Sequence, residues 1–123
     1  MIGPDFGHCP MERLLRRRDF LAAARGPSRA KTGAVVQMLK RDDHAPARIG
    51  FTVTKKLGNA VTRNRIRRRL KEAVRTSLAS QFRNGHDYVL IGRLGTKARD
   101  FSALIQDIRS ALDQLHCMER PKT

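Results

Sequence analysis

The sequence predicts a single α+β domain in which three helices pack with a small central β-sheet, in the order helix, strand, strand, helix, strand, helix. Three observations support this prediction. The length of 123 residues is that of one domain. The content of 40% hydrophobic residues, with only 9 Gly and 5 Pro, is typical of a folded chain. Finally, apolar residues recur with helical spacing in three segments and with strand spacing in three others.

The N-terminal part is expected to be an arm followed by a helix. Residues 1–10 contain two Gly and two Pro, so we expect a flexible arm there, with the folded domain over 11–118 and a short tail over 119–123. Apolar residues at helical spacing predict a helix from Met11 to about Arg25. Gly26 and Pro27 would end it.

Three segments have the patterns of β-strands. Ala34–Leu39 and Arg48–Thr54 are separated by a polar, turn-rich stretch, and we expect them to form a hairpin. In the second of them, apolar and small or polar residues alternate, which indicates one buried face. Asp87–Gly92 is almost entirely apolar after its first residue, which predicts a central strand.

Two further helices carry clear apolar stripes. The longer one, from about Ala60 to Phe82, has a stripe formed by Ile66, Leu70, Ala73, Val74 and Leu78. Asp100 is a suitable N-cap for the last helix. The stripe of that helix is formed by Phe101, Leu104, Ile105, Ile108, Leu112 and Leu115.

The charge predicts a polyanionic partner. The chain has 26 Lys and Arg against 11 Asp and Glu, a formal net charge of +15. Residues 48–75 alone contain ten basic residues and a single acid, Glu72. Nucleic acid is the first candidate and an anionic membrane surface the second. No apolar run approaches the ~20 residues that cross a membrane, which excludes membrane insertion, and we expect nucleic acid and not a membrane as the partner.

The basic residues of the longer helix are placed where they repel. Arg63, Arg65, Arg67 and Arg68 lie in its first turns, where the helix dipole disfavours positive charge. A merely solvated charged face would contain interspersed Glu. Phosphate groups would remove the repulsion, which favours nucleic-acid binding.

The residues argue against catalysis by the protein itself. Hydrolysis of a phosphodiester by bound metal ions needs several carboxylates, but Glu72 is the only acid between His44 and His86. Neither histidine has an evident partner base or nucleophile nearby in sequence. The two cysteines do not suggest a disulfide framework, and we expect a cytoplasmic protein.

The stretch from Arg48 to Leu70, RIGFTVTKKLGNAVTRNRIRRRL, closely resembles the protein subunit family of bacterial ribonuclease P, and the resemblance covers roughly residues 11–118. It implies a protein cofactor for a catalytic RNA that removes the 5′ leader of precursor tRNA with Mg²⁺, held mainly by the RNA. It also implies a ribosomal-protein-S5-like fold with a left-handed βαβ crossover. That fold has a fourth strand, for which a stretch near Ser28–Lys31 is the candidate.

The resemblance also implies two binding surfaces and no metal-ligating or catalytic residues in the protein. The partners would be the catalytic RNA and precursor tRNA, with no DNA expected. The surface for the catalytic RNA would contain Asn59, Arg63, Asn64, Arg65, Arg67, Arg68 and Lys71. The cleft for the leader would contain Phe20, Lys55, Lys56 and Arg93.

The sequence departs from the family at this cleft. Ala24 and Gln37 stand where other members often carry aromatic residues, so stacking on the leader would be weaker or have a different preference. Phe20 would fit the core as well as the cleft, whereas the alternation around Phe51 favours the core.

One alternative remains open at this point. A ribosomal-type or general structural RNA-binding protein would have the same size and charge. The long matching stretch around Arg63–Arg65 argues against it.

Overall fold

The computed structural model describes residues 12–41 and 43–119, so the expected arm over 1–10 and most of the expected tail lie outside the described residues. A five-stranded mixed sheet has the strand order β1-β4-β5-β3-β2. The strands are β1 (Glu12–Arg13), β2 (Ser28–Ala30), β3 (Ala34–Lys40), β4 (Arg48–Thr52) and β5 (His86–Gly92).

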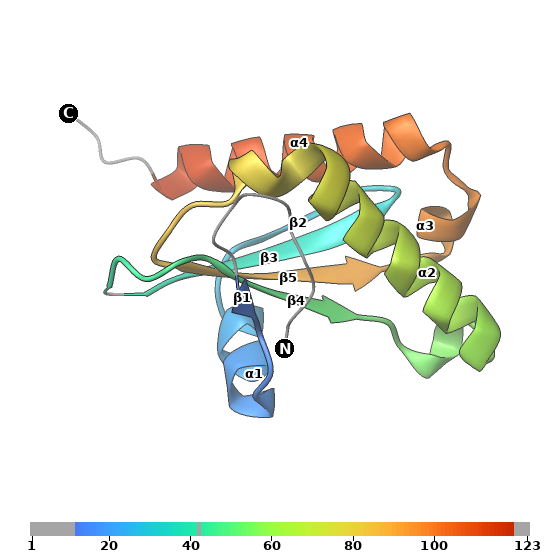
Figure 1. Ribbon diagram of the computed structural model, residues 1–123, viewed down its shortest axis with the longest axis horizontal. Helices are drawn as coiled ribbons and strands as arrows, with labels where there is room; N and C mark the ends of the chain where they lie inside the picture. Colours follow the sequence, from blue (N-terminus) through green and yellow to red (C-terminus); the bar gives the residue numbers. More distant parts are fainter. Residues whose placement is uncertain (1–11, 42, 120–123) are drawn as a thin grey trace.

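Helices cover both faces of this sheet (Figure 1). On one face lie the long helices α2 (Ala60–Ala73) and α4 (Phe101–Glu119), and on the other lies the short α1 (Arg17–Ala24). Helix α2 continues through a π-helical turn (Val74–Leu78) and a 3₁₀ turn (Ala79–Gln81). A further 3₁₀ turn (Lys55–Leu57) precedes α2, and the short α3 (Leu94–Ala98) follows β5.

Strand β5 lies in the middle of the sheet, as its apolar sequence predicts. It pairs antiparallel with β3 and parallel with β4, and six of its seven residues are buried. The predicted hairpin between Ala34–Leu39 and Arg48–Thr54 is therefore wrong, because β5 inserts between β3 and β4. An apolar strand is buried by a neighbour on each side, but local patterning does not encode which strands those neighbours are. The hairpin that does form joins β2 to β3.

The connection from β4 through α2 to β5 joins two adjacent parallel strands. In Figure 1 both strands point to the right, β5 lies above β4, and α2 passes in front, which makes the crossover left-handed. About 98% of such connections are right-handed. The left-handed crossover expected from the resemblance is thus confirmed.

The first predicted helix is wrong over its N-terminal third. Glu12 and Arg13 form β1, which pairs parallel with Arg48 and Ile49 of β4, and α1 begins only at Arg17. Leu14 is buried against Ala23 and Val89 on the α1 face of the sheet. Extended backbone before α1 lets Leu14 reach this cluster and also gives β4 a partner at its outer edge.

Among the remaining elements, the short α3 was not predicted, and the helix predicted from Ala60 to Phe82 is α-helical only to Ala73. The fourth strand expected near Ser28–Lys31 is β2. Asp100 caps α4, since it accepts hydrogen bonds from the backbone of Ser102 and Ala103. The stripes of α2 and α4 pack together on the sheet as one hydrophobic core. Among the described residues, no helix has both the length and the apolar character needed to cross a membrane.

Candidate nucleic-acid interface

Helix α2 buries its apolar stripe and leaves its basic residues outside. Ile66, Leu70 and Ala73 are fully buried. The helix begins at Asn59, whose side-chain oxygen accepts a hydrogen bond from the backbone N–H of Thr62 at 2.9 Å. Asn59 was predicted to bind RNA, and the structure shows that it is the N-cap, with its amide N–H groups still available as donors.

The predicted RNA-binding residues divide between two settings on α2. Asn64, Arg65 and Arg68 are exposed on the outer side of the helix. Arg63, Arg67 and Lys71, each four residues from the next, form a half-buried column that faces the β4 edge of the sheet. We call this set the basic column.

Two contacts orient side chains along the basic column. The Asn64 side-chain oxygen accepts a hydrogen bond from Nη1 of Arg67 at 3.0 Å. At the end of the column, Nζ of Lys71 lies 5.9 Å from the centre of the Phe51 ring on β4. Burial lowers the pKa of Lys71, and the positive charges of Arg13 and Arg67 lower it further. A phosphate group placed here would relieve that repulsion.

Arg69 lies on the opposite flank of α2 and has a different role. It donates hydrogen bonds to the backbone carbonyls of Thr96 at 2.9 Å and Arg99 at 2.6 Å, and its guanidinium lies 5.5 Å from the centre of the Phe101 ring. These contacts tie α2 to the segment between α3 and α4. The helical wheel places Arg67 and Arg69 symmetrically beside the apolar stripe, so only the tertiary structure separates them.

Phe20 lies on α1 and packs against the sheet. Its ring covers the backbone of Gly50 so closely that a Cβ at that position would lie 2.4 Å from Cε1 of Phe20. The same ring forms one wall of an open groove of about 490 Å³, with Leu15, Leu21 and Phe51 among its other lining residues. Phe20 therefore belongs both to a small hydrophobic cluster and to a surface groove, and Phe51 packs on the main core while also reaching this groove.

The basic residues predicted for the leader cleft lie elsewhere. Lys56 and Arg93 line a second open groove, of about 810 Å³, at the carboxyl ends of β4 and β5. Lys31 also lines this groove, and its carbonyl accepts a hydrogen bond from Arg93 at 3.0 Å. Lys55 is exposed in the 3₁₀ turn beside Lys56, but it does not line the groove. The four predicted residues are thus distributed over two neighbouring regions on either side of the end of β4.

An ion-pair network that was not predicted from the sequence anchors α1 to the sheet. Asp87, 1% exposed, accepts hydrogen bonds from Nε of Arg48 at 2.8 Å and Nη2 of Arg48 at 2.6 Å, and from Nη1 of Arg41 at 2.7 Å. Arg48 also reaches Asp19 on α1 at 3.4 Å. These hydrogen bonds and charges, Asp87 first, raise the pKa of Arg48. The sequence contains one signal for this network: Asp87 is an acid at the start of an apolar strand, and a buried carboxylate needs partners.

The arrangement has the chemistry of an RNA-binding surface. It combines guanidinium groups, an ammonium group and exposed amides beside two aromatic rings, which suit phosphates and bases respectively. Over residues 12–41 and 43–119, no three His, Cys, Asp or Glu side chains gather in a way that could hold a metal ion.

Comparison with known proteins gives one family. The family model described as Ribonuclease P matches residues 10–116. The ribonuclease P protein component of Gluconacetobacter diazotrophicus is 57% identical over 101 residues, which cover 81% of this chain and 87% of that protein. The protein of the same description from Caulobacter vibrioides is 48% identical over 105 residues, with 85% and 70% covered.

Solved structures agree with the sequence comparison. The RNase P protein of Staphylococcus aureus superposes with a TM-score of 0.68 at 27% identity, over 83% of this chain and 93% of that one. The RNase P protein from Thermotoga maritima gives a TM-score of 0.67 at 31% identity, over 85% and 94% of the two chains.

Proposed function

The chain belongs to the ribonuclease P protein family, and from this premise we propose that it binds the catalytic RNA through α2 and the 5′ leader of precursor tRNA in the grooves beside β4. It is a protein cofactor of the ribonuclease P ribozyme, a subunit of a tRNA-processing endoribonuclease that partners the ribonuclease P RNA.

One observation carries the assignment of α2 to the catalytic RNA. Its outer side and its basic column present six of the predicted residues, and among the described residues no carboxylate forms an ion pair with any of them. The only acid of α2, Glu72, pairs with Arg75. Five of the six are cations, and unpaired cations in this number are suited to the closely spaced phosphates of a folded RNA. The six residues are Arg63, Asn64, Arg65, Arg67, Arg68 and Lys71.

The groove walled by Phe20 and Phe51 is proposed to take the single-stranded leader. Aromatic rings stack on any base, and such contacts suit a leader whose sequence varies from one precursor to the next. The second groove, with Lys56, Arg93 and Lys31, would hold backbone phosphates of the same strand, and Lys55 lies at its margin. Mg²⁺ is proposed to act in the cleavage step while held mainly by the RNA.

A cleavage assay tests the function as a whole. Precursor tRNA and Mg²⁺ at near-physiological salt are incubated with the protein alone, with ribonuclease P RNA alone, or with both. We expect the protein to stimulate cleavage only in the presence of the RNA. Cleavage by the purified protein alone, or no stimulation in the mixture, would contradict the proposal.

A matched pair of variants tests the role of α2. Asn64→Ala removes a neutral amide that orients Arg67, whereas Arg75→Ala removes a charge one turn beyond the basic column. We expect Asn64→Ala to reduce cleavage at limiting Mg²⁺ more than Arg75→Ala does. Equal effects would leave α2 as a generic basic surface.

A second pair tests the leader groove. Phe20→Leu keeps an apolar contact with Gly50 but removes the aromatic ring, and Phe101→Leu is the control on the opposite face of the sheet. Since stacking contributes ~1–3 kcal/mol per base, the preference for leader-containing over leaderless tRNA should fall about fivefold or more for Phe20→Leu only. An unchanged preference would assign Phe20 to the hydrophobic cluster alone.

A further inference from the structure

Strand β1 places one more cation beside the basic column. Arg13 of β1 pairs in register with Ile49 of β4, and Ile49 belongs to the hydrophobic core under α2. Paired residues of adjacent strands direct their side chains to the same face of the sheet. Arg13 therefore projects on the α2 face, at the outer edge of the sheet, while Glu12 projects on the other face.

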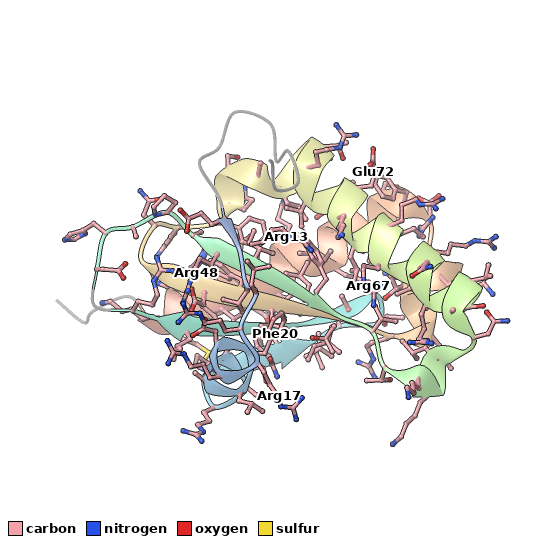
Figure 2. All side chains as sticks on the ribbon, turned by 60° about the horizontal axis from the view of Figure 1, so that its bottom comes forward. Arg13, Arg17, Phe20, Arg48, Arg67 and Glu72 are labelled. Carbon is pink, nitrogen blue, oxygen red and sulfur yellow. The ribbon has the colours of Figure 1, made fainter. Side chains whose placement is uncertain are left out.

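Two other observations bring Arg13 and the basic column together. Phe51 is two residues beyond Ile49 on β4, hence on the same face, and Nζ of Lys71 lies over its ring. The charges of Arg13 and Arg67 both act on Lys71, whose pKa they lower in addition to the effect of burial. Figure 2 labels Arg13 and Arg67 in the region between β1 and α2.

This group of three cations lacks an acidic partner. Among residues 12–41 and 43–118, the ion pairs engage Arg41, Arg48, Arg75 and Arg99, and none engages Arg13, Arg67 or Lys71. One turn before Arg67 in the basic column, Nε of Arg63 is buried without a hydrogen-bond partner within the described structure. Cations that repel one another and donors without acceptors are both stabilised by an anion.

We propose that Arg13, Arg67 and Lys71 form a binding site for backbone phosphate groups of single-stranded RNA at the junction between the basic column and the groove of Phe20 and Phe51. The site rests on the proposed function, since it would join the surface for the catalytic RNA to the groove for the leader. An RNA strand that leaves the groove past Phe51 would meet these three cations next, because Phe51 lines the groove and Lys71 lies over its ring.

The substitution Arg13→Gln tests the site. Arg13 is exposed and its β1 pairing uses only the backbone, so the variant should fold normally, as circular dichroism and thermal unfolding would confirm. Arg29→Gln is the matched control, because Arg29 is on β2 at the opposite edge of the sheet. Binding of each variant is measured against salt for leader-containing precursor tRNA, leaderless tRNA and ribonuclease P RNA.

For Arg13→Gln we expect about threefold to tenfold weaker binding of at least one RNA, and a log–log salt slope reduced by about 0.7. Loss confined to the leader-containing precursor would assign the phosphate to the leader, and loss with ribonuclease P RNA would assign it to the catalytic RNA. Arg29→Gln should match the wild type. If Arg13→Gln binds all three RNAs as Arg29→Gln does, the site is refuted.

A double-mutant cycle sharpens the test. If Arg13 and Lys71 hold the same phosphate, the loss in Arg13→Gln/Lys71→Gln should be smaller than the product of the two single losses. Independent effects would overturn a shared site. The proposed function is tested separately, with the wild-type protein: failure of that protein to stimulate cleavage by ribonuclease P RNA would contradict the function. The Arg13→Gln measurements test only the phosphate site.

Discussion

At the residue scale, the contact between Gly50 and Phe20 shows how a backbone position shapes a candidate binding surface. The Phe20 ring lies over Gly50, and this contact sets how far the ring projects into the groove. Glycine is needed there for close approach, since any side chain would occupy the space of the ring.

Gly50→Ala is expected to move Phe20. The added Cβ would lie 2.4 Å from Cε1 and 2.5 Å from Cζ of the ring, so we expect a loss of ~1–3 kcal/mol in the free energy of unfolding, measured with urea. The preference for leader-containing tRNA should also fall. Val89→Ala is the control, because it destabilises the same cluster by deleting atoms and leaves the ring in place. If both variants change the preference equally, the ring position is not the cause.

The N-cap of α4 gives a prediction about pH. The Ser102 hydroxyl, followed by the backbone N–H groups of Ser102 and Ala103, donates hydrogen bonds that lower the pKa of Asp100. A folded-state pKa below the unfolded value of ~3.9 means that the stabilisation is present above that pH and is lost as pH falls through the folded pKa. Ser102→Ala should raise the pKa of Asp100 in an NMR titration of the carboxyl carbon, whereas Ser110→Ala, further along α4, should leave it unchanged.

At the element scale, α1 depends on the sheet for its position. It has eight residues, and its N-cap residue Arg16 makes no side-chain capping bond. Isolated helices of this length are unstable in water. Its packing through Phe20 and Ala23, and the chain of contacts from Asp19 through Arg48 to Asp87, hold it in place. The network thereby supports one wall of the groove.

Asp87→Asn is expected to destabilise the fold strongly. It would remove the buried carboxylate that Arg41 and Arg48 share and leave them only the more exposed Asp43 and Asp19, and breaking a buried ion pair costs about 3–5 kcal/mol. Asp43→Asn is the control, because the Asp43 side chain is 49% exposed, so its ion pair with Arg41 should contribute under ~1 kcal/mol. Denaturation in urea measures both, and hydrogen exchange of α1 amides should rise in Asp87→Asn. Similar losses in the two variants would contradict a special role for the buried network.

At the scale of the whole molecule, the net charge of +15 is distributed unevenly, with ten basic residues and one acid between 48 and 75. In the fold, these residues form β4, the turn that follows it, and α2, so much of the positive charge lies on the exposed part of α2 and at the end of β4. RNA binding should therefore depend on where a charge lies and not only on the total.

Salt titrations can separate these two cases. About six duplex phosphate contacts give a log–log slope near −5 for the wild type. Arg68→Gln, on the outer side of α2, should reduce the magnitude of the slope by about one. Arg83→Gln removes the same charge from an exposed position after the 3₁₀ turn that ends the α2 segment, and it should leave the slope unchanged. Equal reductions would mean that only net charge matters.

The sequence by itself determined which side of each long element is buried. The stripes of α2 and α4, the central position of β5 and the basic side of α2 all follow from residue spacing, because burial selects one face of a periodic structure. The resemblance to the ribonuclease P protein family further predicted the left-handed crossover and the strand β2.

Only the tertiary structure decided which elements meet. It inserted β5 between β3 and β4, made β1 from residues expected in a helix, and distributed Phe20, Lys56 and Arg93 over two grooves. It also turned Arg69 inward to backbone carbonyls while leaving Arg67 in the basic column. The physical reason is that periodicity records only whether a face is buried, whereas the choice of neighbour depends on the shape, charge and chain connections of the whole molecule.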